Sequence, residues 1–254
     1  MIVDTHAHLG DPQFDPDRTE VLARARNAGV SRVVCVGETL AEARRNLELA
    51  AEYPELLPAA GLYPSRLDAP QADALLLLIR SERPRLAAVG EVGLDHWVVS
   101  DPGERELQLE LFVRFVCLAV ELDLPLNVHS RSAGSQVIAV LLERGARRVQ
   151  LHAFDGRFST ALPAVEAGFL FSIPPSVVRS RQKQKLVGHL PLASLLVESD
   201  SPVLGPEAGA RNEPANAAVA LRAIAEIKGV PEPAVREALA QNAGRLYRLK
   251  DSQL

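Results

Sequence analysis

The sequence is poor in the features that mark secreted and membrane proteins. Its two cysteines, Cys35 and Cys117, form no CxxC pair, which argues against a disulfide framework, a zinc knuckle or a redox motif. The first residues lack the basic and apolar segments of a signal peptide, and no apolar run is long enough to span a bilayer. We therefore expect a cytoplasmic protein with reduced thiols and no membrane partner.

The chain also lacks a surplus of positive charge, and aromatic residues make up only 4% of it. Its formal net charge is −4, whereas proteins that coat nucleic acid usually carry a large basic surplus. A nuclease remains compatible with this charge, because bound divalent cations would offset the acidic groups of its site. The 47% of hydrophobic residues is typical of a globular protein with a substantial core.

Short apolar, β-branched runs alternate with amphipathic stretches along the chain, which is typical of βα units and a parallel sheet. The expected strands are Ile2–His6, Arg32–Gly37, Leu57–Leu62, Leu86–Val92, Leu124–His129, Arg148–His152, Phe169–Ile173 and Ser194–Glu198. The expected helices are Asp17–Ala28, Leu40–Glu52, Pro70–Arg83, Glu104–Leu122, Ala133–Arg144, Ser159–Ala167, Arg181–His189, Asn216–Lys228 and Pro233–Arg245.

Eight such repeats predict an α/β fold of the (β/α)8 TIM-barrel type, with residues 1–254 as a single metallohydrolase domain. The alternative is an open, doubly wound sheet, whose first βα turn should carry a glycine-rich phosphate loop. Residues 4–10 of this chain carry histidines there instead.

Potential metal ligands fall at the carboxyl ends of the expected strands, where βα barrels place their functional groups. They are His6, His8, Glu91, His129, His152 and Asp200. His6 and His8, two residues apart on an extended chain, point to the same side and can chelate one ion. A single histidine at a strand end is more often a satisfied polar residue than a ligand. As a set, however, the six residues predict a site for one or two divalent ions.

Lysine is scarce, and this scarcity bears on how two ions would be bridged. Some barrel hydrolases use a carbamylated lysine on a central strand, but the four lysines of this chain all lie beyond the seventh expected strand. The bridging anion must then be a native carboxylate. Glu91, between Gly90 and Gly93, is the best candidate, because glycine lets the backbone approach an ion closely.

Five segments resemble, in order, the successive motifs of the TatD family of metal-dependent deoxyribonucleases: Asp4–Leu9, Gly90–Asp95, Asn127–Arg131, Leu151–Gly156 and Glu198–Pro202. Residues 129–134, 152–157 and 172–176 look closer still to the TatD-domain-containing protein 3 branch. The resemblance implies an amidohydrolase-type barrel with up to two divalent ions. It assigns His6, His8, Glu91 and Asp200 to one ion, and Glu91, His129 and His152 to the other.

One position departs from the family pattern. Many members have Gly-x-His-Pro after the third strand, whereas this chain has Gly61-Leu62-Tyr63-Pro64. Tyr63 can donate a hydrogen bond or stack on a base, but it cannot become a cation for a phosphate. This departure leaves the substrate preference open.

Other residues are predicted to contact substrate. Arg131 is expected to clamp a phosphate, and Trp97 is expected to stack on a base at the mouth. Phe154 either stacks there or packs beneath the site. Residues 179–185, rich in Arg and Lys, lie where barrels often bind phosphate, although a solvated helix start explains them equally well.

The resemblance implies hydrolysis of phosphodiesters, from the 3′ end of single-stranded DNA. Asp200 is predicted to accept the proton of the attacking water, with Glu91 holding two ions whose identity is Zn, Mn, Co, Fe or Mg. Two alternatives stay open: a metallohydrolase of another ester, lactone or amide on the same barrel, and a metal-binding protein without catalysis. The sequence carries no signal for an oligomeric state.

Overall fold

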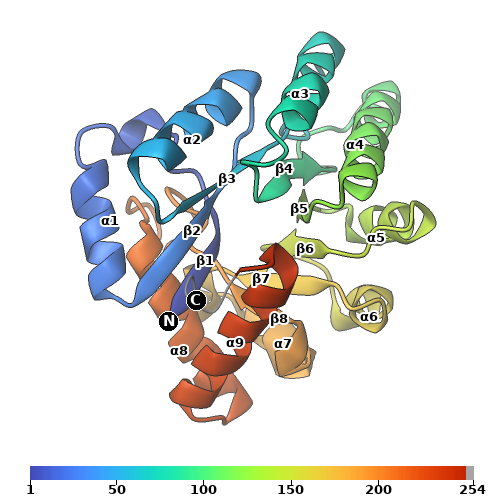
Figure 1. The fold of residues 1–254 in the computed structure, drawn as a ribbon. Coiled ribbons are helices and arrows are strands. Elements are labelled where there is room, and N and C mark those ends of the chain that lie inside the picture. Colours follow the sequence, from blue (N-terminus) through green and yellow to red (C-terminus); the bar gives the residue numbers. More distant parts are fainter. Residues whose placement is uncertain (250–254) are drawn as a thin grey trace.

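The computed structural model describes residues 1–249, and they contain an eight-stranded parallel sheet in the order β1 to β8, ringed by helices (Figure 1). The strands are β1 Ile2–Ala7, β2 Val30–Cys35, β3 Leu56–Ala60, β4 Ala88–Gly93, β5 Leu126–His129, β6 Val149–His152, β7 Leu170–Ile173 and β8 Leu195–Val197. The (β/α)8 prediction is confirmed, with each expected strand present within about two residues of its predicted start and end.

Nine α-helices occur within these residues: α1 Arg18–Asn27, α2 Leu40–Glu52, α3 Ala69–Ser81, α4 Pro102–Leu122, α5 Gly134–Glu143, α6 Phe158–Glu166, α7 Arg181–His189, α8 Ala217–Lys228 and α9 Glu232–Tyr247. Their starts follow local capping chemistry. The carboxylates of Asp68 and Asp101 and the hydroxyls of Thr39 and Ser180 each accept a backbone N–H in the first turn of the helix that follows.

The seam between β8 and β1 closes the barrel. The amide of Asp200 donates to the carbonyl of His6 at 2.8 Å, and the amide of His8 donates to the carbonyl of Ser201 at 2.8 Å. The hydroxyl of Thr5 also donates to the carbonyl of Val197 at 2.8 Å. These bonds join the first and last strands of the chain and place His6, His8 and Asp200 side by side.

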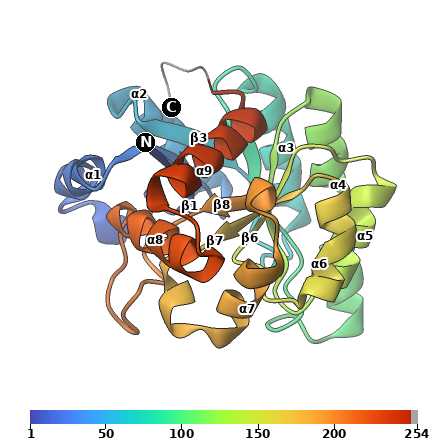
Figure 2. The ribbon, with the colours of Figure 1, turned by 90° about the horizontal axis from the view of Figure 1, so that it is seen from below.

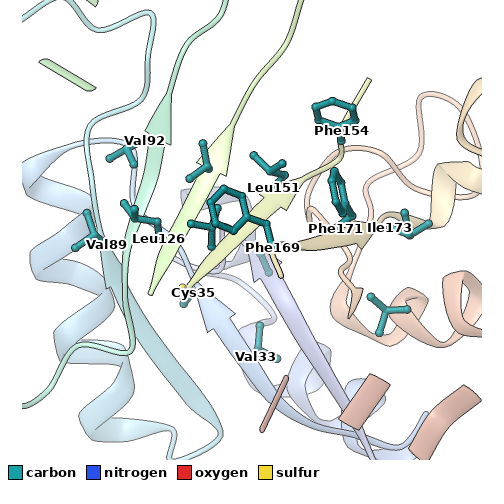
Figure 3. Close-up of a cluster of buried hydrophobic side chains, with 14 of the residues drawn as sticks. Val33, Cys35, Val89, Val92, Leu126, Leu151, Phe154, Phe169, Phe171 and Ile173 are labelled. Atoms are coloured by element: carbon teal, nitrogen blue, oxygen red, sulfur yellow. The ribbon is translucent and has the colours of Figure 1, made fainter. Parts of the chain in front are cut away.

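Apolar residues form two layers. The larger one lies between the strands and the surrounding helices, and Figure 3 shows part of it. Phe154 belongs to this layer: its ring meets that of Phe171 edge to face, with centroids 5.4 Å apart. Of its two predicted roles, the structure shows packing beneath the site. Gly134 and Gly156 make room for the ring, since a Cβ at either would lie less than 3 Å from it.

The smaller layer lies inside the barrel and is closed by α9, which runs beside β1 and β8 (Figure 2). Leu246 and Tyr247 of α9 pack against inward-facing residues such as Val3 and Leu196. The last helix, expected at Pro233–Arg245, therefore seals the amino-terminal end of the barrel.

The predicted single domain extends beyond this description. It was expected to reach Leu254, and residues 250–254 lie outside the described residues.

Within residues 1–249, no helix combines the length and apolarity needed to cross a membrane.

Candidate metal centre

The six predicted ligands meet at the carboxyl end of the barrel, where all but the fully buried His6 line a cavity of about 340 Å³. All except His8 are at most 8% exposed. Three of the six belong to the ends of β1 and β8, and the other three lie in β4, β5 and β6. The strands must therefore close into a barrel before all six side chains can meet.

His6, His8 and Asp200 form one cluster at the β1–β8 seam. The Nε2 atoms of the two imidazoles lie 3.2 Å apart. Oδ1 of Asp200 lies 3.5 Å from Nε2 of His6 and 3.6 Å from Nε2 of His8. Oε2 of Glu91 completes the group, 3.7 and 3.6 Å from the same two nitrogens.

His129 and His152 form a second cluster on the other side of Glu91. Nδ1 of His129 and Nε2 of His152 lie 3.2 Å apart. Each of these nitrogens is 2.9 Å from Oε1 of Glu91. The two oxygens of Glu91 therefore face different pairs of imidazoles, which is the arrangement that a bridging carboxylate requires.

The remaining ring nitrogen of each histidine faces a separate oxygen. Nδ1 of His6 lies 2.8 Å from Oδ1 of Asn127, and Nε2 of His129 lies 3.1 Å from Oδ2 of Asp95. The other two pairs, Nδ1 of His8 with Glu38 and Nδ1 of His152 with Glu198, are 3.8 Å apart, which is too long for a hydrogen bond. The two hydrogen-bonded acceptors fix which nitrogen of His6 and of His129 carries the proton, as is usual around metal-binding histidines.

Sequence reasoning assigned no role to these four residues. Asn127, Asp95 and Glu198 lie inside the quoted motifs, whereas Glu38 lies outside all of them. Glu38 follows the end of β2 by three residues, so the strand-end rule that found the ligands would have found it too.

The hydrogen bonds show whether this site suits a cation. The amide nitrogen of Asn127 donates to the carbonyl of Thr5, so its oxygen must accept from Nδ1 of His6. His6 then carries its proton on Nδ1, and the lone pair of Nε2 points at His8 and two carboxylates. Lone pairs of nitrogen and carboxylate oxygen that face one another repel unless a proton or a cation lies between them. The residues therefore fit a metal ion.

The ionisation of the site agrees with that charge pattern. Burial lowers the pKa of His6 to about 3, and the neighbouring His152 adds to this effect. Burial would also lower the pKa of His8, but the nearby carboxylates of Asp200 and Glu91 raise it to about 9. Burial would raise the pKa of Glu91, yet His152 and His129 hold it well below its ordinary value. Glu91 is thus an anion among imidazoles.

The backbone around the mouth adopts conformations that non-glycine residues rarely use. Ser132, Ala153 and Asp200 have φ values of 57°, 43° and 54°. Ser132 follows β5, which ends at His129, and Ala153 follows β6, which ends at His152. Asp200, after β8, is itself a predicted ligand. Left-handed non-glycine residues tend to gather at functional sites, where the surrounding structure holds them in place.

The predicted substrate-contacting residues lie around the same mouth. Tyr63 and Arg131 line the cavity, and the ring of Tyr63 stands edge-on to that of His129, with centroids 5.2 Å apart. Trp97 is 68% exposed and lies outside the cavity lining, with the guanidinium of Arg131 5.0 Å from its ring centroid. Lys183, which had no separate prediction, also lines the cavity and donates to the carbonyl of Ala153 at 2.8 Å.

The chain is similar to known proteins in both sequence and structure. Residues 3–248 match the sequence model of the family described as TatD related DNase. The putative deoxyribonuclease TATDN3 of Mus musculus is 46% identical, with 97% of this chain and 88% of that protein covered. Deoxyribonuclease TATDN3 of Homo sapiens is 44% identical, covering 97% of this chain and 94% of that protein.

A bacterial protein provides the structural comparison. Escherichia coli YjjV, described as an uncharacterized metal-dependent hydrolase, is 31% identical, with 97% of this chain and 98% of that protein covered. The crystal structure of a TatD homologue called YjjV from Escherichia coli K12 superposes with a TM-score of 0.91 at 29% identity, covering 98% of both chains.

Proposed function

We propose that this chain, which belongs to the TatD-related DNase family, is a deoxyribonuclease that uses two divalent ions to cleave single-stranded DNA from its 3′ end. Family membership makes it a metal-dependent hydrolase. The number of ions, the strand preference and the direction of cleavage are the parts that we add.

The position of Glu91 is the observation that carries the proposal. Its Oε1 lies 2.9 Å from a nitrogen of His129 and of His152, while its Oε2 faces His6 and His8. One carboxylate between two pairs of imidazoles supports two adjacent cations. We therefore assign His6, His8, Asp200 and Glu91 to one ion, and Glu91, His129 and His152 to the other.

Bound divalent ions would lower the pKa of water and offset charge on the phosphate oxygens. Ligands of mixed imidazole and carboxylate type suit Zn, Mn, Co or Fe, and Mg less well.

The protein's own groups would orient the substrate and move the proton. Asp200 lines the cavity with Oδ1 turned toward His6 and His8, and it would accept a proton from the attacking water. Arg131, which lines the same cavity, would bind a non-bridging oxygen of the phosphate. Tyr63 would offer its hydroxyl or ring to the nucleotide.

An assay on end-labelled single-stranded DNA tests the proposed activity, with each metal added in turn to metal-free protein. We expect stepwise loss of nucleotides from the 3′ end. Carboxyl esters and lactones serve as parallel substrates. Their hydrolysis in place of DNA cleavage would contradict the proposal and favour another hydrolase on the same barrel.

Glu91→Gln tests the bridge separately, because it keeps the side-chain shape and removes the anion. We expect the metal content per protein, measured by elemental analysis, to fall sharply. Glu38→Gln is the matched control, since Glu38 groups with His8 and Glu91 but with neither His129 nor His152, and its loss should reduce the metal content less. A Glu91→Gln protein with wild-type metal content would remove Glu91 from the bridge.

A further inference from the structure

A second hollow lies next to the metal centre, between the start of α6 and the length of α7. Its volume is about 640 Å³, and we call it the basic groove. Its charged and ring-bearing lining residues are Arg157, Phe158, Arg181, Lys185 and His189. Figure 1 shows α6 and α7 as neighbours in the outer ring of helices.

All the formally charged side chains that line the groove are positive. Within residues 1–249, no carboxylate lines it, and Arg157, Arg181 and Lys185 form no ion pair. Some arginines elsewhere on the surface are paired, for example Arg80 with Glu121 and Arg114 with Asp73. An unpaired cluster stands out in a chain whose net charge is −4.

The placement of these cations is unfavourable for the isolated protein. Arg181 and Lys185 are four residues apart on α7, where like charges repel across one helical turn. Arg181 is the first residue of α7, and Arg157 stands at the N-cap of α6 without a side-chain cap bond. Helix starts carry partial positive charge and favour acidic residues. An anion in the groove would remove both penalties at once.

The groove also offers a surface for stacking. The rings of Phe158 and His189 lie nearly parallel, with an interplanar angle of 28° and centroids 5.5 Å apart. His189 is exposed. Cationic side chains beside an exposed ring are the combination that binds single-stranded nucleic acid without base preference.

One short segment forms a wall of both hollows. Ala153 and Asp155 line the metal-centre cavity, and Gly156 lines the basic groove. Residues of α7 hold this segment: Lys183 donates to the carbonyl of Ala153 at 2.8 Å, and Gln182 donates to the carbonyl of Gly156 at 2.9 Å. A strand whose phosphate lies in the cavity can therefore continue into the groove across this wall.

We propose that the basic groove binds the sugar-phosphate backbone of single-stranded DNA beyond the scissile linkage, with phosphates on Arg157, Arg181 and Lys185 and a base on the His189 ring. The inference rests on the proposed nuclease function. It assigns the groove to strand binding, outside the reacting centre.

The test replaces all three cations by glutamine, as Arg157→Gln, Arg181→Gln and Lys185→Gln in one protein. The matched control replaces three exposed arginines outside the groove, Arg44, Arg147 and Arg222, by glutamine, so that the net charge changes equally. Binding of a twelve-nucleotide strand is measured by fluorescence anisotropy at several salt concentrations. Cleavage is measured on this strand and on a dinucleotide, and melting temperatures verify folding.

We expect the groove variant to bind the long strand roughly tenfold or more weakly, and the slope of log affinity against log salt to fall by about two, at about 0.7 for each lost phosphate contact. Cleavage of the dinucleotide should match the wild type. A groove variant indistinguishable from the control would overturn the groove alone. Equal losses on the dinucleotide would place these residues at the reacting centre. Wild-type protein that neither binds nor cleaves DNA would overturn the nuclease function and the groove together.

Discussion

The amino and carboxyl ends of the barrel differ in the side chains that fill them. At the amino end, α9 covers the interior with apolar side chains, and the buried hydroxyl of Tyr247 donates to Oε1 of Gln150 at 2.5 Å. At the carboxyl end, imidazoles and carboxylates face one another, and Nδ1 of His152 and Oγ of Ser130 have no hydrogen-bond partner among residues 1–249. Buried polar groups normally find partners.

The difference separates stability from function along one axis. The amino end lowers the free energy of the folded chain by burying apolar surface. The carboxyl end retains facing hydrogen-bond acceptors, and a bound cation would relieve their repulsion. If this division is correct, substitutions at the two ends should change different measured quantities.

The largest expected effect is on kcat, from Asp200→Asn at the carboxyl end. Asparagine can still offer an oxygen to a metal ion and tolerates the φ of 54° at this position, so the fold should survive. Loss of the proton acceptor should lower kcat by about 10²–10⁴-fold. Single-turnover kinetics on protein of measured metal content check this value. A metal-loaded variant within a few-fold of wild type would show that the proton leaves by another route.

A smaller effect is expected at the amino end from Leu246→Ala, where the side chain is 4% exposed against the interior layer. Removing a buried leucine should cost about 2–5 kcal/mol in the free energy of unfolding. Denaturant unfolding measures this cost, and kcat of the folded, metal-loaded variant should be unchanged. A loss of kcat without a loss of stability would break the division between the two ends.

The smallest effect is expected at Trp97, on the rim of the carboxyl end. The guanidinium of Arg131 lies over its ring, while Trp97 remains 68% exposed. If a base stacks there, Trp97→Ala should weaken binding of single-stranded DNA by roughly 1–3 kcal/mol. Titration in an Asp200→Asn background measures this change without cleavage.

Trp97→Phe is the control for the rim, because it keeps an aromatic face and should retain most of the affinity. Trp97 is the only tryptophan of the chain, so its fluorescence should also respond to DNA in the Asp200→Asn protein. Equal affinities of the wild type, Trp97→Ala and Trp97→Phe would limit this residue to packing on Arg131.

Much of the fold could be predicted from local sequence. The helices Leu40–Glu52 and Arg181–His189 agree residue for residue with the structure, because their caps and periodicity are local signals. The expected second strand, Arg32–Gly37, was displaced by two residues, since β2 runs from Val30 to Cys35. Pairing of Val30 with Ile2 of β1 decides that start, and this contact is distant in sequence.

The sequence by itself determined the order of the elements and which side chains stand at strand ends, because periodicity, caps and the βα rule act over a few residues. The tertiary structure alone decided that Glu91 turns one oxygen to each imidazole pair, that Glu38 joins His8, and that α9 seals the barrel. These arrangements join residues 30 or more positions apart. Barrel closure selects them, and no local pattern encodes that closure.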